Sequence, residues 1–172
     1  MADDGVFGVE IVTPEQSLYA GGARSVVLAT SEGNFTVLDG HTPLVGDVVP
    51  CELKVEDPEG TVMRLAVHGG FVQVDTSAGA AEGLAEGDGP LPGLSTRVTV
   101  LAGVAELANE IDVPRAELAR EAASQRVAEL SSGRGGAAES ADGSGDAVAL
   151  TEAERALARA ELRLAVATDA AA

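Results

Sequence analysis

The chain has 172 residues with 11 basic and 28 acidic side chains, and its formal charge of −17 at pH 7 argues against binding to nucleic acid or to an anionic lipid surface. Apolar residues make up 45% of the chain and aromatic residues only 2%, so we expect a core of Val, Leu, Ile and Ala. We expect neither a secretory leader nor a membrane-spanning segment, and the single cysteine, Cys51, excludes an internal disulfide.

Short apolar runs typical of β-strands recur from residue 6 to residue 102. Phe7, Val9 and Ile11 alternate with glycine or glutamate, which is the period of a strand with one buried face. The other expected strands lie at residues 26–29, 35–38, 53–55, 63–67, 71–74 and 98–101. Many short strands in close succession predict an antiparallel β-sandwich or barrel over residues 1–103, interrupted by a long loop at residues 77–96.

From residue 104 onward the apolar residues follow a helical period. Asp112 is a good N-cap for a first helix. Residues 131–149 are rich in Gly, Ser, Asp and Ala and predict a flexible link, after which residues 151–154 (Thr-Glu-Ala-Glu) match a capping box. The sequence therefore predicts a two-helix antiparallel hairpin over residues 104–172. Its apolar stripes are mostly Ala, which buries little area, so we expect a weakly held hairpin.

Motifs for catalysis and metal binding are missing from the sequence. It contains no phosphate-binding loop, no nucleophile elbow and no zinc-binding helix. His41 and His68 have no ligand-type residues at metal-binding spacing, and we interpret both as turn or strand-end residues. We therefore expect no catalytic residue, no metal site and no enzyme activity from the chain on its own.

Seven of the 11 basic residues lie beyond position 103. Three of them, Arg155, Arg159 and Arg163, follow one another at steps of four and so share one face of the second helix. Two interpretations remain open. The row is either a solvated face relieved by neighbouring glutamates, or a contact surface for a phosphate chain or an acidic protein surface.

Three blocks of sequence occur in a specific order: residues 9–16 (VEIVTPEQ), residues 31–44 (SEGNFTVLDGHTPL) and residues 67–74 (VHGGFVQV). In order, in spacing and in the helical segment that follows, the chain resembles the ε subunit of the bacterial F-type ATP synthase. The second block is the most specific part of the resemblance, which extends along nearly the whole chain.

The resemblance implies a β-sandwich and a helical hairpin placed in the central stalk, bound to the γ subunit and to the ring of c subunits. It implies a non-catalytic rotor subunit that couples proton flow to ATP synthesis, and whose C-terminal helices restrain ATP hydrolysis by the catalytic α and β subunits. We then expect a peripheral protein on the cytoplasmic face of the bacterial cell membrane, with no direct insertion into lipid.

In relatives, the loops that match Glu32, Gly33, Asn34 and His41 touch the c ring, so the resemblance implies a ring contact by these residues. Asn34 stands where many relatives carry a second glutamate, which weakens one charged contact. Residues 40–43 also suit a simple bend, and that interpretation stays open. In an extended state of the helices, the row of Arg155, Arg159 and Arg163 would face an acidic loop of the catalytic subunits.

Residues 111–116 (IDVPRA) match a motif of relatives whose ε subunit binds ATP. The resemblance implies no required cofactor, but ATP as a weak regulatory ligand with millimolar affinity. The residues implied are Glu106, Asp112, Arg115, Arg126, Arg159 and Arg163. Asp112 serves equally well as an N-cap alone, and Ala122 stands where the pattern has an arginine, with Arg126 one turn further on.

Two other functions remain as alternatives on the sequence. One is a free-standing β-sandwich binding module whose helices form a partner-binding arm. The other is a regulatory nucleotide sensor that acts outside any rotary complex. Co-purification with membrane-bound ATPase activity separates the rotor subunit from both.

Overall fold

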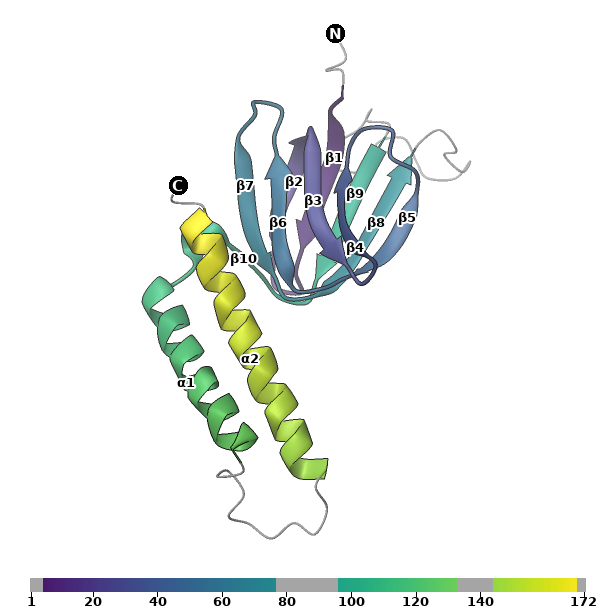
Figure 1. Ribbon diagram of the computed structural model, residues 1–172. Helices are drawn as coiled ribbons and strands as arrows, with labels where there is room; N and C mark the ends of the chain where they lie inside the picture. Colours follow the sequence, from purple (N-terminus) through teal and green to yellow (C-terminus); the bar gives the residue numbers. More distant parts are fainter. Residues whose placement is uncertain (1–4, 77–95, 133–143, 170–172) are drawn as a thin grey trace. The chain divides into compact units, whose positions relative to one another are not determined.

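The computed structural model describes residues 5–76, 96–132 and 144–169 and divides the chain into two compact units, Met1–Ala108 and Asn109–Ala172 (Figure 1). The sequence predicts a boundary between residues 103 and 104. Strand β10 (Ala105–Leu107), however, pairs with β7 (Val62–Val67) and so belongs to the first unit. Short strands of three residues carry too little periodicity to be read from the sequence.

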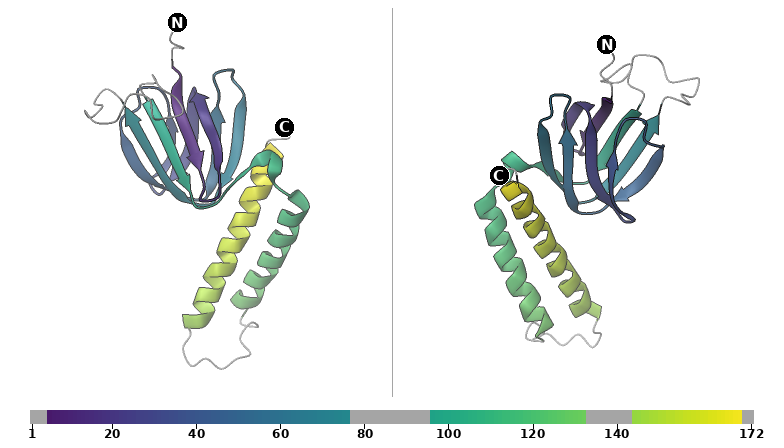
Figure 2. Two further views of the ribbon diagram at one scale, coloured as in Figure 1. Left: turned by 180° about the vertical axis from the view of Figure 1, so that it is seen from behind. Right: turned by 45° about the horizontal axis from the view of Figure 1, so that its top comes forward.

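The first unit is built from two layers of strands that face each other (Figures 1 and 2). One layer holds, in order, β10, β7, β6 (Cys51–Glu56), β3 (Ser25–Thr30) and β4 (Gly33–Val37). The other layer holds β5 (Leu44–Val48), β8 (Gly70–Thr76), β9 (Thr96–Ala102), β1 (Phe7–Val12) and β2 (Ser17–Ala23). The layers join where Thr30 pairs with Val48, which gives a nearly closed sandwich and confirms the predicted fold class.

One strand pair departs from the antiparallel pattern. β1 and β9 run parallel, with Val9 opposite Val98, whereas the other paired strands of the described chain are antiparallel. A parallel pair needs a long crossover connection. Here the whole of β2–β8 lies between the two strands in the sequence.

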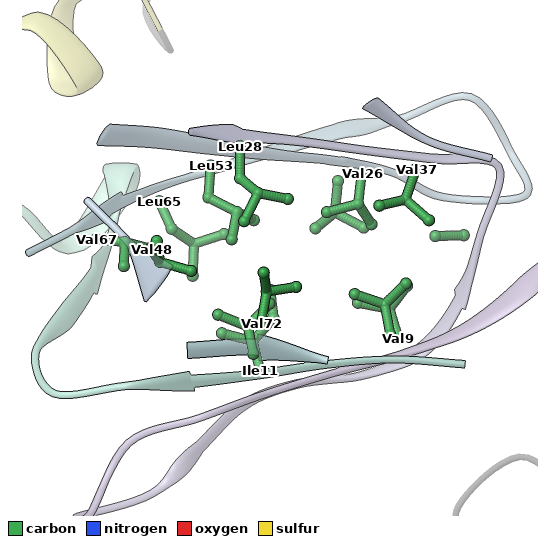
Figure 3. Close-up of a cluster of buried hydrophobic side chains, with 14 of the residues drawn as sticks. Val9, Ile11, Val26, Leu28, Val37, Val48, Leu53, Leu65, Val67 and Val72 are labelled. Carbon is green, nitrogen blue, oxygen red and sulfur yellow. The ribbon is translucent and has the colours of Figure 1, made fainter. Parts of the chain in front are cut away.

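The core lies between the two layers and consists of branched aliphatic side chains (Figure 3). Leu28, Leu53 and Leu65 project from one layer toward Ile11 and Val72 of the other, and all five are at most 1% exposed. This confirms the expected aliphatic core. Phe7 is the one aromatic residue of the described chain that is completely buried.

Besides β10, two further strands, β2 and β5, are absent from the sequence prediction. β2 contains Gly21 and Gly22, and β5 follows Pro43 and contains Gly46, so both carry residues that are depleted in strands. Both segments nevertheless adopt the extended conformation of a strand, because β2 pairs with β1 and β5 pairs with β8. The predicted loop at residues 77–96 ends one residue early, because Thr96 begins β9 opposite Thr76, and the remainder of that loop lies outside the described residues.

The second unit contains two antiparallel helices packed along their length, α1 (Val113–Ser131) and α2 (Ser144–Asp169) (Figures 1 and 2). The Asp112 carboxylate accepts a hydrogen bond from the Arg115 backbone N–H at 3.0 Å, which confirms it as the N-cap of α1. The buried residues of the two helices are small: Ala116, Ala123, Ala153, Ala160 and Val166. The predicted helical hairpin is thus confirmed, with a contact area made mostly of alanine.

The second helix begins earlier than the sequence predicts. α2 begins at Ser144, so residues 144–149 are helical rather than part of the link, and Ser131 still belongs to α1. Thr151 is not an N-cap, because it lies inside α2 and its hydroxyl donates to the Ala147 carbonyl at 2.9 Å. Gly145 and Asp146 are typical of linkers, but both lie within α2, which packs along α1. The rest of the predicted link lies outside the described residues.

Candidate functional site

The first candidate surface is formed by two chain segments of the sandwich that border one hollow. β3 and β4 are joined by Ser31 and Glu32, with Thr30 paired to Gly33, and the φ of +130° at Gly33 suits a glycine. The loop expected around residues 32–34 is therefore shorter than expected, since Gly33 and Asn34 already belong to β4. All four residues from Ser31 to Asn34 are exposed.

The second segment follows β4 and carries His41. The turn is made by residues 38–41, because the His41 N–H donates to the Leu38 carbonyl at 3.1 Å and Gly40 has a φ of +76°. Its centre thus lies at Asp39 and Gly40, earlier than the predicted 40–43. The half-buried His41 ring lies 6.3 Å from the Phe35 ring, and its Nδ1 is 2.8 Å from the Thr42 carbonyl oxygen.

Both segments border an open hollow of about 400 Å³ between β4 and β5. The structure therefore brings the four predicted ring-contact residues, Glu32, Gly33, Asn34 and His41, to one surface. Asp47 adds a second carboxylate to the rim, and Phe35 and Leu44 line the hollow with apolar surface. Such a mixture of polar rim and apolar floor suits contact with polar loops of another protein.

An apolar face on the outside of the second layer was missed by the sequence analysis. Val45, Phe71 and Leu101 are 74%, 56% and 52% exposed. Phe71 lies directly opposite Leu101 on β9, and Val45 lies one row away on β5. The signal in the sequence is limited to Phe71 and Leu101, because the other outward positions of the two strands carry polar residues: Gln73, Asp75, Arg97 and Thr99. Large exposed apolar side chains on one face of a sheet favour contact with another protein.

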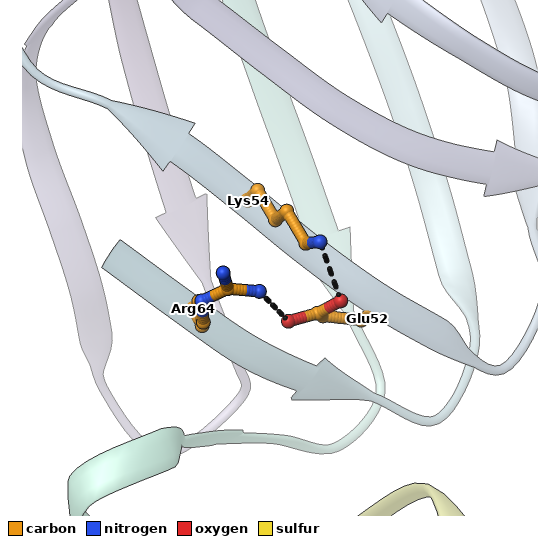
Figure 4. Close-up of polar contacts among 3 residues, drawn as sticks. All are labelled: Glu52, Lys54 and Arg64. Carbon is orange, nitrogen blue, oxygen red and sulfur yellow. Dashed lines mark hydrogen bonds and ion pairs between the residues drawn. The ribbon is translucent and has the colours of Figure 1, made fainter. Parts of the chain in front are cut away.

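A charged cluster on β6 and β7 was also missed (Figure 4). The Glu52 carboxylate accepts from Arg64 at 2.6 Å and from Lys54 at 2.9 Å. Burial opposes ionisation of Glu52, but the hydrogen bonds from Arg64 and Lys54 outweigh it and lower the pKa of this carboxyl. The cluster stabilises the outer face of the sandwich, and the alternation of strand residues could have placed the three side chains on one face.

The residues predicted for ATP binding fall in both units. Glu106 is half-buried in β10 of the first unit, whereas the other five lie in or next to the helices of the second. Asp112 is engaged as the helix cap, and Arg126 forms an ion pair with Glu129 at 3.3 Å. Arg115 is exposed in the first turn of α1.

The arginine row lies on α2. Arg155 and Arg159 are exposed and, within the described part of the chain, form no ion pair, while Arg163 is half-buried. The side chains of Arg155 and Arg159 are therefore accessible to an anionic partner. No group of three or more metal-ligand residues occurs among the described residues, and none of their helices has the length and apolar character needed to span a bilayer.

Comparison with known proteins identifies the family. Residues 6–78 match the family described as the ATP synthase Delta/Epsilon chain, beta-sandwich domain. The ATP synthase epsilon chain of Desulforapulum autotrophicum is 33% identical over 158 residues, covering 92% of this chain and 93% of the relative. The epsilon chain of Desulforudis audaxviator is 38% identical over 120 residues, covering 70% and 73%. The chain belongs to the ATP synthase epsilon chains.

Epsilon chains are non-catalytic subunits of the central stalk of the F-type ATP synthase, so the expectation that this chain is no enzyme on its own is confirmed. A chain in the structure of the Euglena gracilis mitochondrial ATP synthase, OSCP/F1/c-ring, matches with a TM-score of 0.63 and 20% identity, covering 96% of this chain and 81% of that one. That likeness shows the shared fold. Membership in the epsilon chains favours the rotor subunit over both alternatives left open by the sequence.

Proposed function

We propose that this epsilon chain turns with the rotor of a bacterial F-type ATP synthase at the cytoplasmic face of the membrane, as a peripheral protein without direct lipid insertion. It binds the γ subunit and the c-subunit ring, and its helices restrain ATP hydrolysis by the α and β subunits. The observation that carries the proposal is the similarity to epsilon chains over both units, 92% of the chain in one relative. Similarity confined to the sandwich would support the stalk position but not the regulatory helices.

The hollow bordered by Glu32, Gly33, Asn34 and His41 is the surface we assign to the c ring. Cysteines placed at positions 34 and 41, in a background in which Cys51 is replaced by Ala, should cross-link to the ring in the assembled synthase. Glu59→Cys is the control, because the β6–β7 turn lies at the opposite end of β3 from the β3–β4 turn, as the pairs Ser25–Glu56 and Thr30–Gly33 show. Cross-links from 34 and 41 to γ alone would show that the assigned orientation is wrong.

The apolar face of Val45, Phe71 and Leu101 is the surface we assign to the γ subunit. A rotor subunit must stay attached to its shaft while torque passes through it. Burial of exposed aromatic and aliphatic side chains supplies that kind of attachment, at about 25 cal/mol per Å² of apolar area. The surrounding polar residues then determine the orientation of the two subunits at the interface rather than the affinity.

The regulatory role rests on a hairpin whose two states differ little in free energy. Buried alanines contribute little hydrophobic energy, so a difference of about a few kcal/mol separates packed from extended helices, and a partner or ligand biases it. In the extended state, Arg155, Arg159 and Arg163 meet an acidic surface of the catalytic subunits. Exposed guanidinium groups pair with carboxylates bidentately, which favours this contact over solvation alone.

Removal of the second unit tests the regulatory role. The synthase is assembled with the chain truncated after Ala108, which keeps β10 in the sandwich, and ATP hydrolysis and synthesis are measured beside the full-length complex. We expect hydrolysis to rise and synthesis to stay close to its original rate. Equal hydrolysis in both complexes, with the truncated subunit present at full occupancy, would show that the helices do not restrain it.

Weak ATP binding to the helices is the second part of the regulatory proposal. Arg115, Arg159 and Arg163 offer guanidinium groups to the phosphates, and no cofactor is otherwise required. Because Asp112 is engaged as a helix cap and Arg126 is paired with Glu129, these two contribute less than the other four. A weak site of this kind senses millimolar changes in ATP.

A further inference from the structure

Thr96 is the one residue with a polar side chain that is fully buried among the described residues of the chain. It begins β9, opposite Thr76, and its hydroxyl is used in both directions. The oxygen accepts a hydrogen bond from the Gly40 N–H at 2.9 Å, and the hydroxyl donates to the Asp39 carboxylate at 2.9 Å. Two bonds therefore tie the start of β9 to the turn that follows β4.

One of these bonds satisfies a backbone N–H that has no acceptor within the turn itself. In the turn of residues 38–41, the His41 N–H bonds to the Leu38 carbonyl, so the Gly40 N–H at its centre has no partner within the turn. The positive φ of Gly40 directs the chain onward and sets where His41 emerges. Thr96 supplies the missing acceptor from the opposite layer, since β4 and β9 belong to different layers of the sandwich.

We propose that Thr96 is a positioning residue for the contact of His41 with the c ring, acting through Asp39 and Gly40, an inference that rests on the proposed function. With the turn held, His41 stays against Phe35 at the border of the hollow. Without the Thr96 hydroxyl, the turn samples other conformations, and the His41 side chain leaves this position. Thr96, at the start of β9, thereby positions His41 for the contact with the c ring without touching the ring itself.

Three variants separate positioning from general stability. Thr96→Val keeps the shape and β-branching of the side chain but removes the hydroxyl. Thr96→Ser restores the hydroxyl, and Asp39→Ala removes the carboxylate from an exposed position that the core does not need. Hydrogen exchange of the Gly40 amide is followed by NMR on the full chain, and the cross-link from a cysteine at position 41 to the ring is followed in the assembled synthase, with the cross-link from position 34 as the internal reference.

We expect Gly40 exchange to accelerate by about fivefold or more in Thr96→Val, as the loss of one net hydrogen bond predicts, and less in Asp39→Ala. The ratio of the position-41 to the position-34 cross-link should fall in Thr96→Val and recover in Thr96→Ser. Unchanged Gly40 exchange and an unchanged cross-link ratio in Thr96→Val, at unaltered folding, would overturn the proposal. If neither position links to the ring even with Thr96 intact, the assigned ring contact itself is wrong, and unchanged Gly40 exchange then overturns the positioning role separately.

Discussion

Arg64 on β7 and Glu52 on β6 form an ion pair with an N–O distance of 2.6 Å, and this pair makes the stability of the sandwich depend on pH. The pKa of Glu52 is lowered in the folded chain, so the pair stabilises the fold above the ordinary carboxyl pKa of about 4.3. That stabilisation is lost as the pH falls through the lowered pKa, because the protonated carboxyl no longer attracts the guanidinium.

We expect Glu52→Gln to lower the free energy of unfolding by about 1 kcal/mol at pH 7 and to leave it almost unchanged below the lowered pKa. Urea denaturation at several pH values measures this, with the fluorescence of Tyr19, the only tyrosine, as a reporter of the sandwich. Glu15→Gln, at an exposed carboxylate, is the control. An equal loss at every pH would contradict the assignment.

Gly69 and Gly70 should respond differently to the same substitution. Both have positive φ, at +121° and +153°, so an alanine is strained at either position by about 1–3 kcal/mol. At Gly70 the added Cβ would also overlap the Leu101 carbonyl oxygen, whereas at Gly69 the nearest atom is 3.6 Å away. We expect Gly70→Ala to be much the more destabilising in urea titrations. Equal costs would show that only the dihedral angle matters.

Phe71→Ser should weaken binding of the γ subunit by about tenfold or more, as expected for an aromatic residue central to an interface. The folding stability should change little, because the side chain is exposed. Val62→Ser is the matched control, at an exposed apolar residue on the other layer. Calorimetric titration with isolated γ measures both. If Val62→Ser weakens binding and Phe71→Ser does not, γ contacts the other layer.

Replacement of Arg155, Arg159 and Arg163 by alanine should raise ATP hydrolysis and leave synthesis nearly unchanged, because the contact with an acidic surface is lost. The double variant Arg155→Ala/Arg159→Ala changes only exposed side chains and guards against unfolding at half-buried Arg163. The triple replacement by lysine keeps the charge and should keep part of the restraint. Hydrolysis that stays low in the alanine variants would leave the row as a solvated face.

Calorimetry of the full chain should detect ATP with a dissociation constant in the millimolar range. Arg115→Ala and Arg159→Ala should weaken the binding, because each removes a guanidinium that can pair with phosphate. Asp112→Asn keeps the helix cap, since asparagine caps as well as aspartate, and tests the carboxylate alone. An absence of heat at several millimolar ATP, with helicity confirmed by circular dichroism, would remove the hypothesis.

The strands with one buried face could be predicted from alternation, because burial selects apolar residues at every second position. Val9, Leu53 and Val72 show this directly. β2 and β5 could not, because Gly21, Gly22 and Gly46 weaken the local preference and the strands depend on pairing with distant partners. The local sequence pattern therefore predicts strands whose own residues favour the extended conformation. It does not predict strands that form only because they pair with another strand of the same sheet.

The candidate surfaces divide in the same way. The block around Glu32 and His41 was singled out because a short segment of the chain carries the resemblance to a known family, and the structure brings its residues to one hollow. The pairing of Phe71 with Leu101 and the bonds of Thr96 to residues 39 and 40 join segments far apart in the sequence. Such contacts depend on register between strands, which a single sequence does not specify.

The parallel pairing of Val9 with Val98 has a consequence for biosynthesis. β1 occupies an inner position of its layer, between β2 and β9, and of these three strands β9 is synthesised last. Until then β1 has only the β1–β2 hairpin, and an isolated hairpin is marginally stable in water. The nascent chain therefore exposes one apolar strand edge throughout translation of the sandwich, so slow elongation before residue 102 favours misassembly and binding by chaperones.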